Sequence, residues 1–136
     1  MPKQDKVLIV QLCSQRTFLT RAQTSGNDAV YKLPAGLAEG IGPYMEQLRV
    51  TWEGMEFSTN FRAKVQMSYS VTGKTWSTPV DILSTQSGDG QTLGSFYTTE
   101  TEFGPKLRFD LVCWNDTGSA VESGKVTASL EIVLRS

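Results

Sequence analysis

Side chains that could perform acid, base or nucleophilic chemistry are scarce in this chain. Its 136 residues contain no histidine, which removes the commonest general base, the commonest metal ligand and the usual pH switch. A serine or cysteine nucleophile would then need a lysine or carboxylate as its base. The sequence has no nucleophile elbow and no Ser-x-x-Lys pattern with its supporting motifs. We therefore expect that the protein is not an enzyme.

The acidic residues offer only weak candidate sites. Glu100 and Glu102 share one face of a predicted strand, as glycosidase carboxylates could, but a solvated edge strand explains them equally well. Asp89 and Asp116 lie in predicted turns, and neither turn has the alternating oxygen ligands and terminal glutamate of a calcium loop. No glycine-rich phosphate-binding motif precedes a helix. We expect no bound metal and no cofactor.

The two cysteines, Cys13 and Cys113, fall in apolar runs typical of strands. A disulfide between them is geometrically feasible, but two buried free thiols suit a chain whose start carries no secretion signal. The first apolar run, Val7–Val10, is too short to span a membrane or to form the core of a signal peptide. We therefore expect synthesis in a cytosol-like compartment and no membrane partner.

Three aromatic residues remain as candidate functional residues, Trp76, Tyr97 and Trp114. Trp76 is predicted at the tip of a hairpin, Tyr97 on a threonine-rich strand and Trp114 at a strand end. Exposed flat aromatic side chains anchor protein interfaces or stack on sugars. Alternatively, each folds over an end of the core. The sequence leaves these three interpretations open.

The elements that must position these residues are predicted to be strands. Phe61–Val71 alternates apolar and polar residues without a break, which gives a strand one buried face and one wet face. Lys125–Arg135 also places its apolar residues at alternate positions. In Lys106–Trp114 the pattern predicts Leu107, Phe109, Leu111 and Cys113 inside and Arg108, Asp110 and Val112 outside. With the shorter runs between turn signals, the pattern predicts an all-β, antiparallel β-sandwich or jelly-roll-like fold of about eight strands with little helix.

The remaining segments carry less regular patterns. The continuous apolar run Val7–Val10 predicts a strand covered on both faces. The other expectations are a strand at Lys6–Cys13, a second strand or arm at Arg16–Ala22, a short strand at Ala29–Leu33 that stops at Pro34, a loop with one helical turn around Leu37–Glu39, strands at Tyr44–Gly54, Val80–Leu83 and Ser95–Phe103, a hairpin tip at Ser70–Trp76, and long loops at Ser84–Gly94 and Asn115–Gly124.

Length and composition are those of one ordinary soluble domain. Hydrophobic residues make up 39% of the chain and charged residues 20%. The length predicts a single domain at 1–136, with an N-terminal arm at 1–6. The net charge of -1 argues against binding of nucleic-acid phosphates, which needs a basic face.

Two resemblances to known families follow from these features. Ser70–Trp76 resembles the Asp-box hairpin of sialidase-like propellers, with Thr72 in place of the aspartate, and this resemblance implies a hairpin. The strand end Tyr31–Pro34, the Thr-, Ser- and Gly-rich loops and the closing strand Lys125–Arg135 resemble the small β-sandwich structural proteins of tailed-phage virions. These include capsid cement (decoration) proteins and head or tail accessory proteins.

The phage resemblance implies a structural role in a virion, made in the host cytoplasm, with homo-oligomer and shell-protein contacts and no catalysis. We expect those contacts at the Met1–Lys6 arm and at the Ser84–Gly94 and Asn115–Gly124 loops. The alternative is a carbohydrate-binding or receptor-recognition module that uses Trp76, Tyr97 and Trp114 to stack on a glycan.

Overall fold

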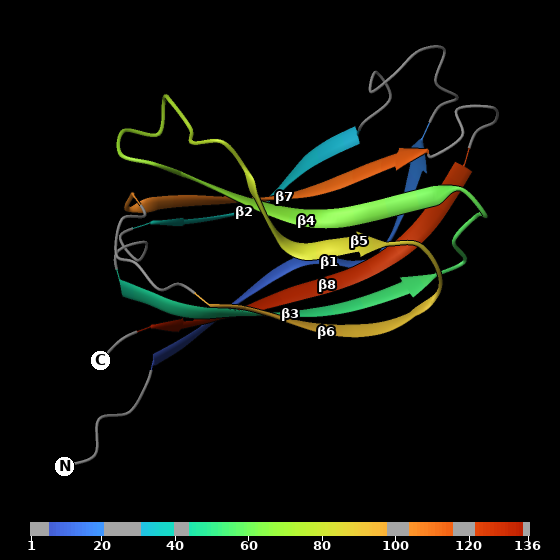
Figure 1. Cartoon of the computed structure of the whole chain (residues 1–136), viewed down its shortest axis with the longest axis horizontal. Helices are drawn as coiled ribbons and strands as arrows, with labels where there is room; N and C mark the ends of the chain where they lie inside the picture. Colours follow the sequence, from blue (N-terminus) through green and yellow to red (C-terminus); the bar gives the residue numbers. More distant parts are fainter. Residues whose placement is uncertain (1–5, 21–30, 40–43, 98–103, 116–121, 135–136) are drawn as a thin grey trace.

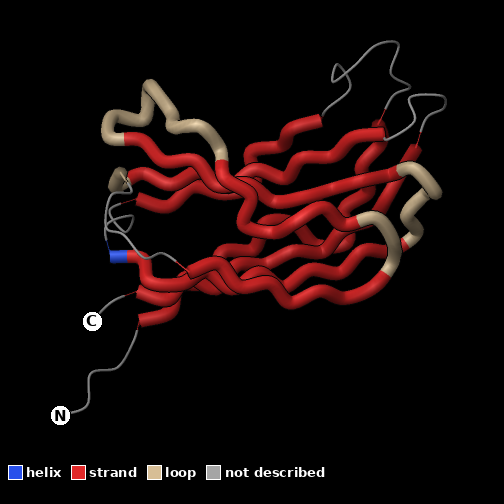
Figure 2. Tube along the Cα trace, viewed as in Figure 1, coloured by secondary structure: helices blue, strands red, loops and turns tan. Residues whose placement is uncertain are grey.

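The computed structural model describes residues 6–20, 31–39, 44–97, 104–115 and 122–134, and these form two stacked layers of strands (Figure 1). Apart from a short helical turn at Tyr44, the regular structure of these residues is all strand (Figure 2). The eight strands are β1 (Lys6–Thr20), β2 (Tyr31–Glu39), β3 (Met45–Met55), β4 (Phe61–Ser70), β5 (Val80–Gln86), β6 (Gly90–Tyr97), β7 (Lys106–Asn115) and β8 (Glu122–Leu134).

The two layers are antiparallel sheets of four strands each. One sheet has the order β1-β8-β3-β6 and the other has the order β2-β7-β4-β5. The chain therefore crosses to the other sheet at every connection except β4–β5. This is the eight-stranded jelly roll, in which two Greek keys close a sandwich. The predicted fold class is confirmed, and β1, β6, β2 and β5 are the edge strands.

The core lies between the two sheets and is filled by alternate side chains of the central strands. In β4 the odd-numbered residues Phe61, Ala63, Val65 and Met67 are fully buried, as the alternation predicts. The largest buried side chain is Trp52 on β3. Cys13 and Cys113 are buried free thiols, which confirms the expectation of unpaired cysteines.

The first strand differs from its prediction in two ways. Residues 16–20 are the second half of β1 and not a separate strand or arm. Two register shifts near Cys13 separate the two halves, and Gln15 has a φ of 46° there. The expectation that Val7–Val10 is covered on both faces is wrong, because side chains of this run are exposed and, among the described strands, β1 lies at a sheet edge beside β8. Val7 is 48% exposed and Ile9 is 72% exposed.

The second strand continues where the sequence predicted a stop. β2 runs through Pro34 to Glu39 and pairs with β7, with a register shift between Pro34 and Gly36. The predicted helical turn at Leu37–Glu39 is therefore wrong. Proline lacks a backbone N–H, but edge strands and bulges tolerate it, and β2 provides both.

The predicted long loop at Ser84–Gly94 is also wrong. Only Ser87–Asp89 separates β5 from β6, and β6 pairs residue by residue with β3. Glycine suits close packing inside this strand, since a Cβ on Gly94 would lie 3.0 Å from Cδ1 of Leu83. Cross-strand pairing and close packing thus override the low strand propensity of the segment.

The hairpin at the end of β4 is confirmed. β4 and β5 are antiparallel neighbours, and the Ser77 N–H donates to the Tyr69 carbonyl at 2.8 Å, below the tip. Several predicted features lie outside the described residues: most of the Met1–Lys6 arm, residues 98–103 with Glu100 and Glu102, and residues 116–121 with Asp116.

Candidate functional site

Two of the three predicted aromatic residues lie on the outer face of the β2-β7-β4-β5 sheet. β7 is a central strand whose odd-numbered residues enter the core, so Trp114 points away from the core at one end of the strand. Its ring lies 5.7 Å from the Nζ of Lys64. Trp76 comes from the β4–β5 connection, and its ring lies against Arg108, near the other end of β7. Both tryptophans are half-buried.

The polar side chains between the two tryptophans pair with one another. Arg108 lies 3.4 Å (Nε to Oδ2) from Asp110, and Lys64 lies 3.2 Å (Nζ to Oδ1) from Asp81. Gln66 donates to the same Asp81 carboxylate at 2.9 Å. These contacts balance positive charge with negative charge on this face. They leave no basic stripe among these residues for a nucleic-acid backbone.

Asp110 and Val112 were expected outside and do lie on the outer face, yet both are buried. They are buried because β7 is a central strand, with a neighbouring strand on each side. Gln66 of β4 flanks Asp110 on one side, and Pro34 of β2 occupies the matching position on the other. The sequence pattern correctly predicted the face, but it could not reveal how far the neighbouring strands cover it.

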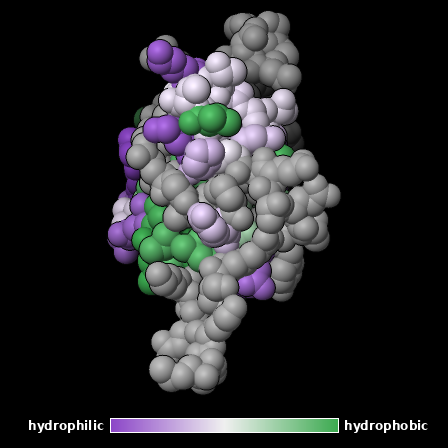
Figure 3. All heavy atoms as spheres, turned by 90° about the vertical axis from the view of Figure 1, so that its left-hand side faces the viewer, coloured by the Kyte–Doolittle hydropathy of each residue, from purple (hydrophilic) through white to green (hydrophobic). Residues whose placement is uncertain are grey.

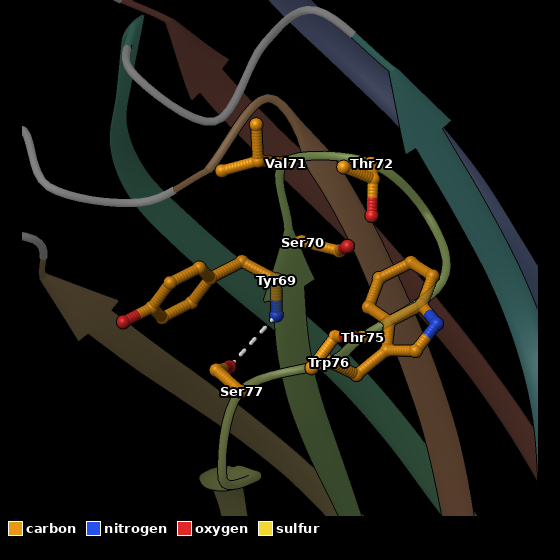
Figure 4. A pocket seen from close by; sticks show the side chains of 7 residues that line it. All are labelled: Tyr69, Ser70, Val71, Thr72, Thr75, Trp76 and Ser77. Carbon is orange, nitrogen blue, oxygen red and sulfur yellow. Dashed lines mark hydrogen bonds between the residues drawn. The ribbon is translucent and has the colours of Figure 1, made fainter.

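A groove of about 360 Å³ lies beside Trp76 at the hairpin tip (Figure 4). Its lining combines the aromatic rings of Tyr69 and Trp76 and the aliphatic Val71 with the hydroxyls of Ser70, Thr72, Thr75 and Ser77. The hydroxyls also hold the loop in shape. Ser77 Oγ accepts from the Tyr69 N–H at 3.0 Å, and Ser70 Oγ accepts from the Gly73 N–H at 2.8 Å. Gly73 has a φ of 84°, which favours glycine at this turn.

The three predicted aromatic residues do not form one platform. Tyr97 belongs to β6 in the other sheet, where its backbone pairs with Gln47. The positions of Arg108 and Trp114 are separated by about 20 Å along β7, at 3.3 Å per residue. Within the described ranges, Trp76 therefore lies beside a groove and Trp114 lies apart from it. An interface or glycan role for any of the three stays a prediction.

The first half of β1 is a candidate site that sequence reasoning missed. Val7, Leu8 and Ile9 are 48%, 41% and 72% exposed. Figure 3 looks at the end of the molecule where β1 begins, and it shows a hydrophobic area among the described residues there. The signal was present in the sequence: four apolar residues in a row, without the charges that usually protect a strand edge.

The other sheet edges carry features that discourage pairing with another strand. β2 contains Pro34 and a register shift. β5 has two register shifts against β4 and the charged Asp81. β6 pairs with β3 without a shift, but its two glycines, Gly90 and Gly94, provide no side chains to pack and weaken it as a partner strand. In contrast, β1 pairs with β8 without a shift from Lys6 to Gln11, so its free edge is regular, apolar and open.

The described residues hold no arrangement suited to metal binding or cysteine chemistry. Within the described ranges, no three His, Cys, Asp or Glu side chains gather closely enough to hold a metal ion. Asp89, weighed above as a calcium ligand, accepts a hydrogen bond from the Phe57 N–H at 2.8 Å, as a turn residue does. Burial raises the pKa of the Cys113 thiol to about 12, and it also raises the pKa of Cys13. Raised pKa values keep both thiols protonated and poorly nucleophilic.

The part of the chain that the structure describes contains no helix of the length and apolarity needed to cross a membrane.

Comparison with known proteins gives a fold but no family. No protein-family model matches the chain, and no curated protein matches it. Among solved structures, the VP2 subviral particle of infectious bursal disease virus matches with a TM-score of 0.74 and 11% identity, over 97% of this chain. The structure of the Gx strain of the same virus matches with a TM-score of 0.73 and 11% identity, over 98% of this chain.

The chain spans about a third of the length of these viral proteins, since the matches cover 33% of each of them. A xylan-binding domain of Paenibacillus barcinonensis also matches, with 10% identity over 100% of this chain and 99% of that domain. Its TM-score of 0.49 is too low to support an argument about glycan binding. At these identities the likeness concerns the fold alone: this chain has the β-sandwich fold also found in viral capsid proteins.

Proposed function

We propose that this chain is a non-enzymatic structural protein of a virion, which acts by assembling with copies of itself and with a shell protein. The observation that carries the proposal is the open apolar edge of β1, where Val7, Leu8 and Ile9 meet solvent. Exposed apolar side chains on a regular strand edge favour association, because pairing buries them and completes the backbone hydrogen bonds.

The virion setting is supported by the fold. The capsid structures of infectious bursal disease virus match over nearly the whole of this chain. In the finer form of the proposal, the protein is a capsid cement (decoration) protein or a minor head or tail protein of a tailed phage. The sequence resemblance described above supports that form, and the expected location is the virion.

A structural role depends on apolar contact surface and not on catalytic groups. The groove beside Trp76 is lined by hydroxyls and aromatic or aliphatic side chains, without a carboxylate pair or an activated nucleophile. The buried cysteines have raised pKa values, which make them poor nucleophiles. Burial of apolar surface between subunits is then the source of binding energy.

Light scattering during size exclusion, at several protein concentrations, tests the proposal. A defined oligomer, or binding to purified capsids, is the expected result. A strict monomer at every concentration that also leaves purified capsids unbound would overturn it.

A second candidate function is supported by the groove at Trp76. An aromatic ring beside serine and threonine hydroxyls suits a sugar, which can stack its apolar face on the ring and form hydrogen bonds at its edges. The role would be glycan or receptor recognition. A glycan array tests it, with Trp76→Ala as the variant expected to abolish binding and Trp114→Ala as the comparison, because Trp114 lies away from the groove. Retained binding by Trp76→Ala would remove this candidate.

A further inference from the structure

We propose that the free edge of β1 at Lys6–Gln11 binds the same edge of a second copy of this chain. The two strands pair antiparallel and join the β1-β8-β3-β6 sheets of the two copies into one sheet of eight strands. This inference rests on the proposed assembly function and deepens it, because it names both the surface and the partner.

The geometry of this edge is the first support. From Lys6 to Gln11, β1 pairs with β8 without a register shift. The edge of this segment that faces away from β8 is therefore a regular row of backbone donors and acceptors. The second half of β1 is different. Register shifts near Cys13 and the φ of 46° at Gln15 distort it, and Arg16 adds a charge. Pairing is therefore favoured at the first half.

The chemistry of the run points to a second copy as the partner. Between Lys6 and Arg16 there is no charged residue, so the edge offers nothing to attract a charged strand. Its own sequence is the best match, since an antiparallel pair centred on Leu8 sets Val7 of one copy opposite Ile9 of the other, and Leu8 opposite Leu8. Opposite residues of an antiparallel pair share a face, so each apolar side chain meets another.

Charge also selects the antiparallel direction. In a parallel pair in register, Lys6 of one copy would lie beside Lys6 of the other. In the antiparallel pair centred on Leu8, Lys6 lies opposite Val10 of the other copy. The two lysines are then separated by about 13 Å along the strands, and the Debye length at physiological ionic strength is about 8 Å. Repulsion between them is therefore largely screened.

Symmetry fits a closed contact. A pair centred on one residue has a two-fold axis, so the same patch serves both copies. Val7 and Ile9 lie on the outer face, at the level of Val133 and Glu131 of β8. Because the central residue lies opposite itself, the outer faces of both sheets remain on the same side. The joined sheet is then continuous, and both cores lie beneath it.

The size of the contact predicts a weak pair. Three partly exposed side chains and one strand edge bury less than the standard interface of about 800 Å² per partner. We therefore expect a weak, reversible dimer that forms as the protein concentration rises, as in the transient class of interface.

Ile9→Lys tests the inference, because it adds one charge at a side chain that is 72% exposed and outside the core. Leu93→Lys is the matched control. Leu93 is 81% exposed and lies on β6, the opposite edge strand of the same sheet. In sedimentation equilibrium, the wild-type protein and Leu93→Lys are expected to dimerise with the same dissociation constant, and Ile9→Lys to weaken dimerisation at least tenfold.

The outcomes separate this inference from the proposed function. An oligomer that Ile9→Lys leaves unchanged would overturn the β1 pairing and leave the assembly function standing. A wild-type protein that stays monomeric at all concentrations would overturn the pairing as well, and capsid binding would then decide the assembly function. If the β1 edge instead pairs with a strand of another protein, the wild-type protein alone is expected to stay monomeric.

A cross-linking experiment gives an independent readout of register. The two native cysteines are buried, so a cysteine introduced at the edge is the accessible one. Opposite residues in antiparallel strands have Cα atoms about 4.5–5.5 Å apart, which a disulfide can bridge. Under mild oxidation, Leu8→Cys is expected to form a covalent dimer, because Leu8 lies opposite Leu8 of the other copy. Ile9→Cys and Leu93→Cys are expected not to, because Ile9 lies opposite Val7 of the other copy and Leu93 lies on another strand. Equal cross-linking at all three positions would contradict the pairing.

Discussion

The guanidinium carbon of Arg108 lies 4.7 Å from the centroid of the Trp76 ring. Arg108 is on β7 and Trp76 is in the connection between β4 and β5, so this contact fastens the hairpin tip to the central strand of its sheet. The same guanidinium faces the buried carboxylate of Asp110 at 3.4 Å. One side chain therefore orders the groove and balances a buried charge.

Replacement of Arg108 is expected to destabilise the protein. Arg108→Ala removes a contact with the Trp76 ring of about 0.5–1 kcal/mol and the cation that faces a buried carboxylate, which adds a few kcal/mol. Urea unfolding measures the change in the free energy of unfolding. Arg49→Ala is the control, because the exposed Arg49–Glu131 pair is expected to contribute about 0.5 kcal/mol or less. Equal losses for the two variants would contradict this account of Arg108.

Gly124 is expected to tolerate no larger side chain. A Cβ at this position of β8 would lie 2.5 Å from Cε1 of Phe61, whose buried ring also makes an edge contact with Phe57. Gly124→Ala should therefore lower the free energy of unfolding by about 1–3 kcal/mol through overpacking. Gly88→Ala provides the control, since nothing lies within 4 Å of its added Cβ. The idea fails if both alanines have the same effect in a denaturant titration.

The stability of the protein is expected to fall at alkaline pH because of Cys113. Its pKa is about 12 in the folded state and its ordinary value is 9.0, so the thiol is neutral in both states below pH 9. Above pH 9 the unfolded chain loses this proton first, which favours unfolding by about 1.4 kcal/mol per pH unit until pH 12. The contribution is therefore complete below pH 9 and is lost as the pH rises towards 12.

Cys113→Ala isolates this effect. The variant is expected to be less stable at neutral pH, because it leaves a cavity in the core, but to show a shallower loss of stability between pH 9 and 11. Other alkaline titrations are common to both proteins and cancel in the difference. Parallel curves for the wild type and the variant would show that Cys113 does not titrate as described.

Most of the strand pattern was predictable from sequence because the central strands have one buried and one exposed face. β4 alternates strictly, β7 and β8 do so over most of their length, and the structure buries the predicted residues, such as Phe109 and Leu130. The edges were not predictable in the same way. Proline is disfavoured within strands, but Pro34 lies beside a register shift on an edge strand, where it is tolerated. Gly94 of β6 packs closely against Leu83.

The candidate site was only partly predictable. Trp76 was correctly assigned to a hairpin tip, but nothing local reveals that Arg108, more than thirty residues later, packs on its ring. The run Val7–Val10 was interpreted as a fully covered strand because apolar runs usually are. Its exposure depends on the position of β1 at an edge, which is a property of strand order and not of the run itself.

The central claim is that this protein assembles with copies of itself and with a shell protein. Its mass in solution across a range of concentrations tests that claim most directly. Size exclusion with multi-angle light scattering should give a mass above the 15.0 kDa of one chain, which rises with concentration. A mass of 15.0 kDa at every concentration, together with no binding to purified capsids, would contradict the claim.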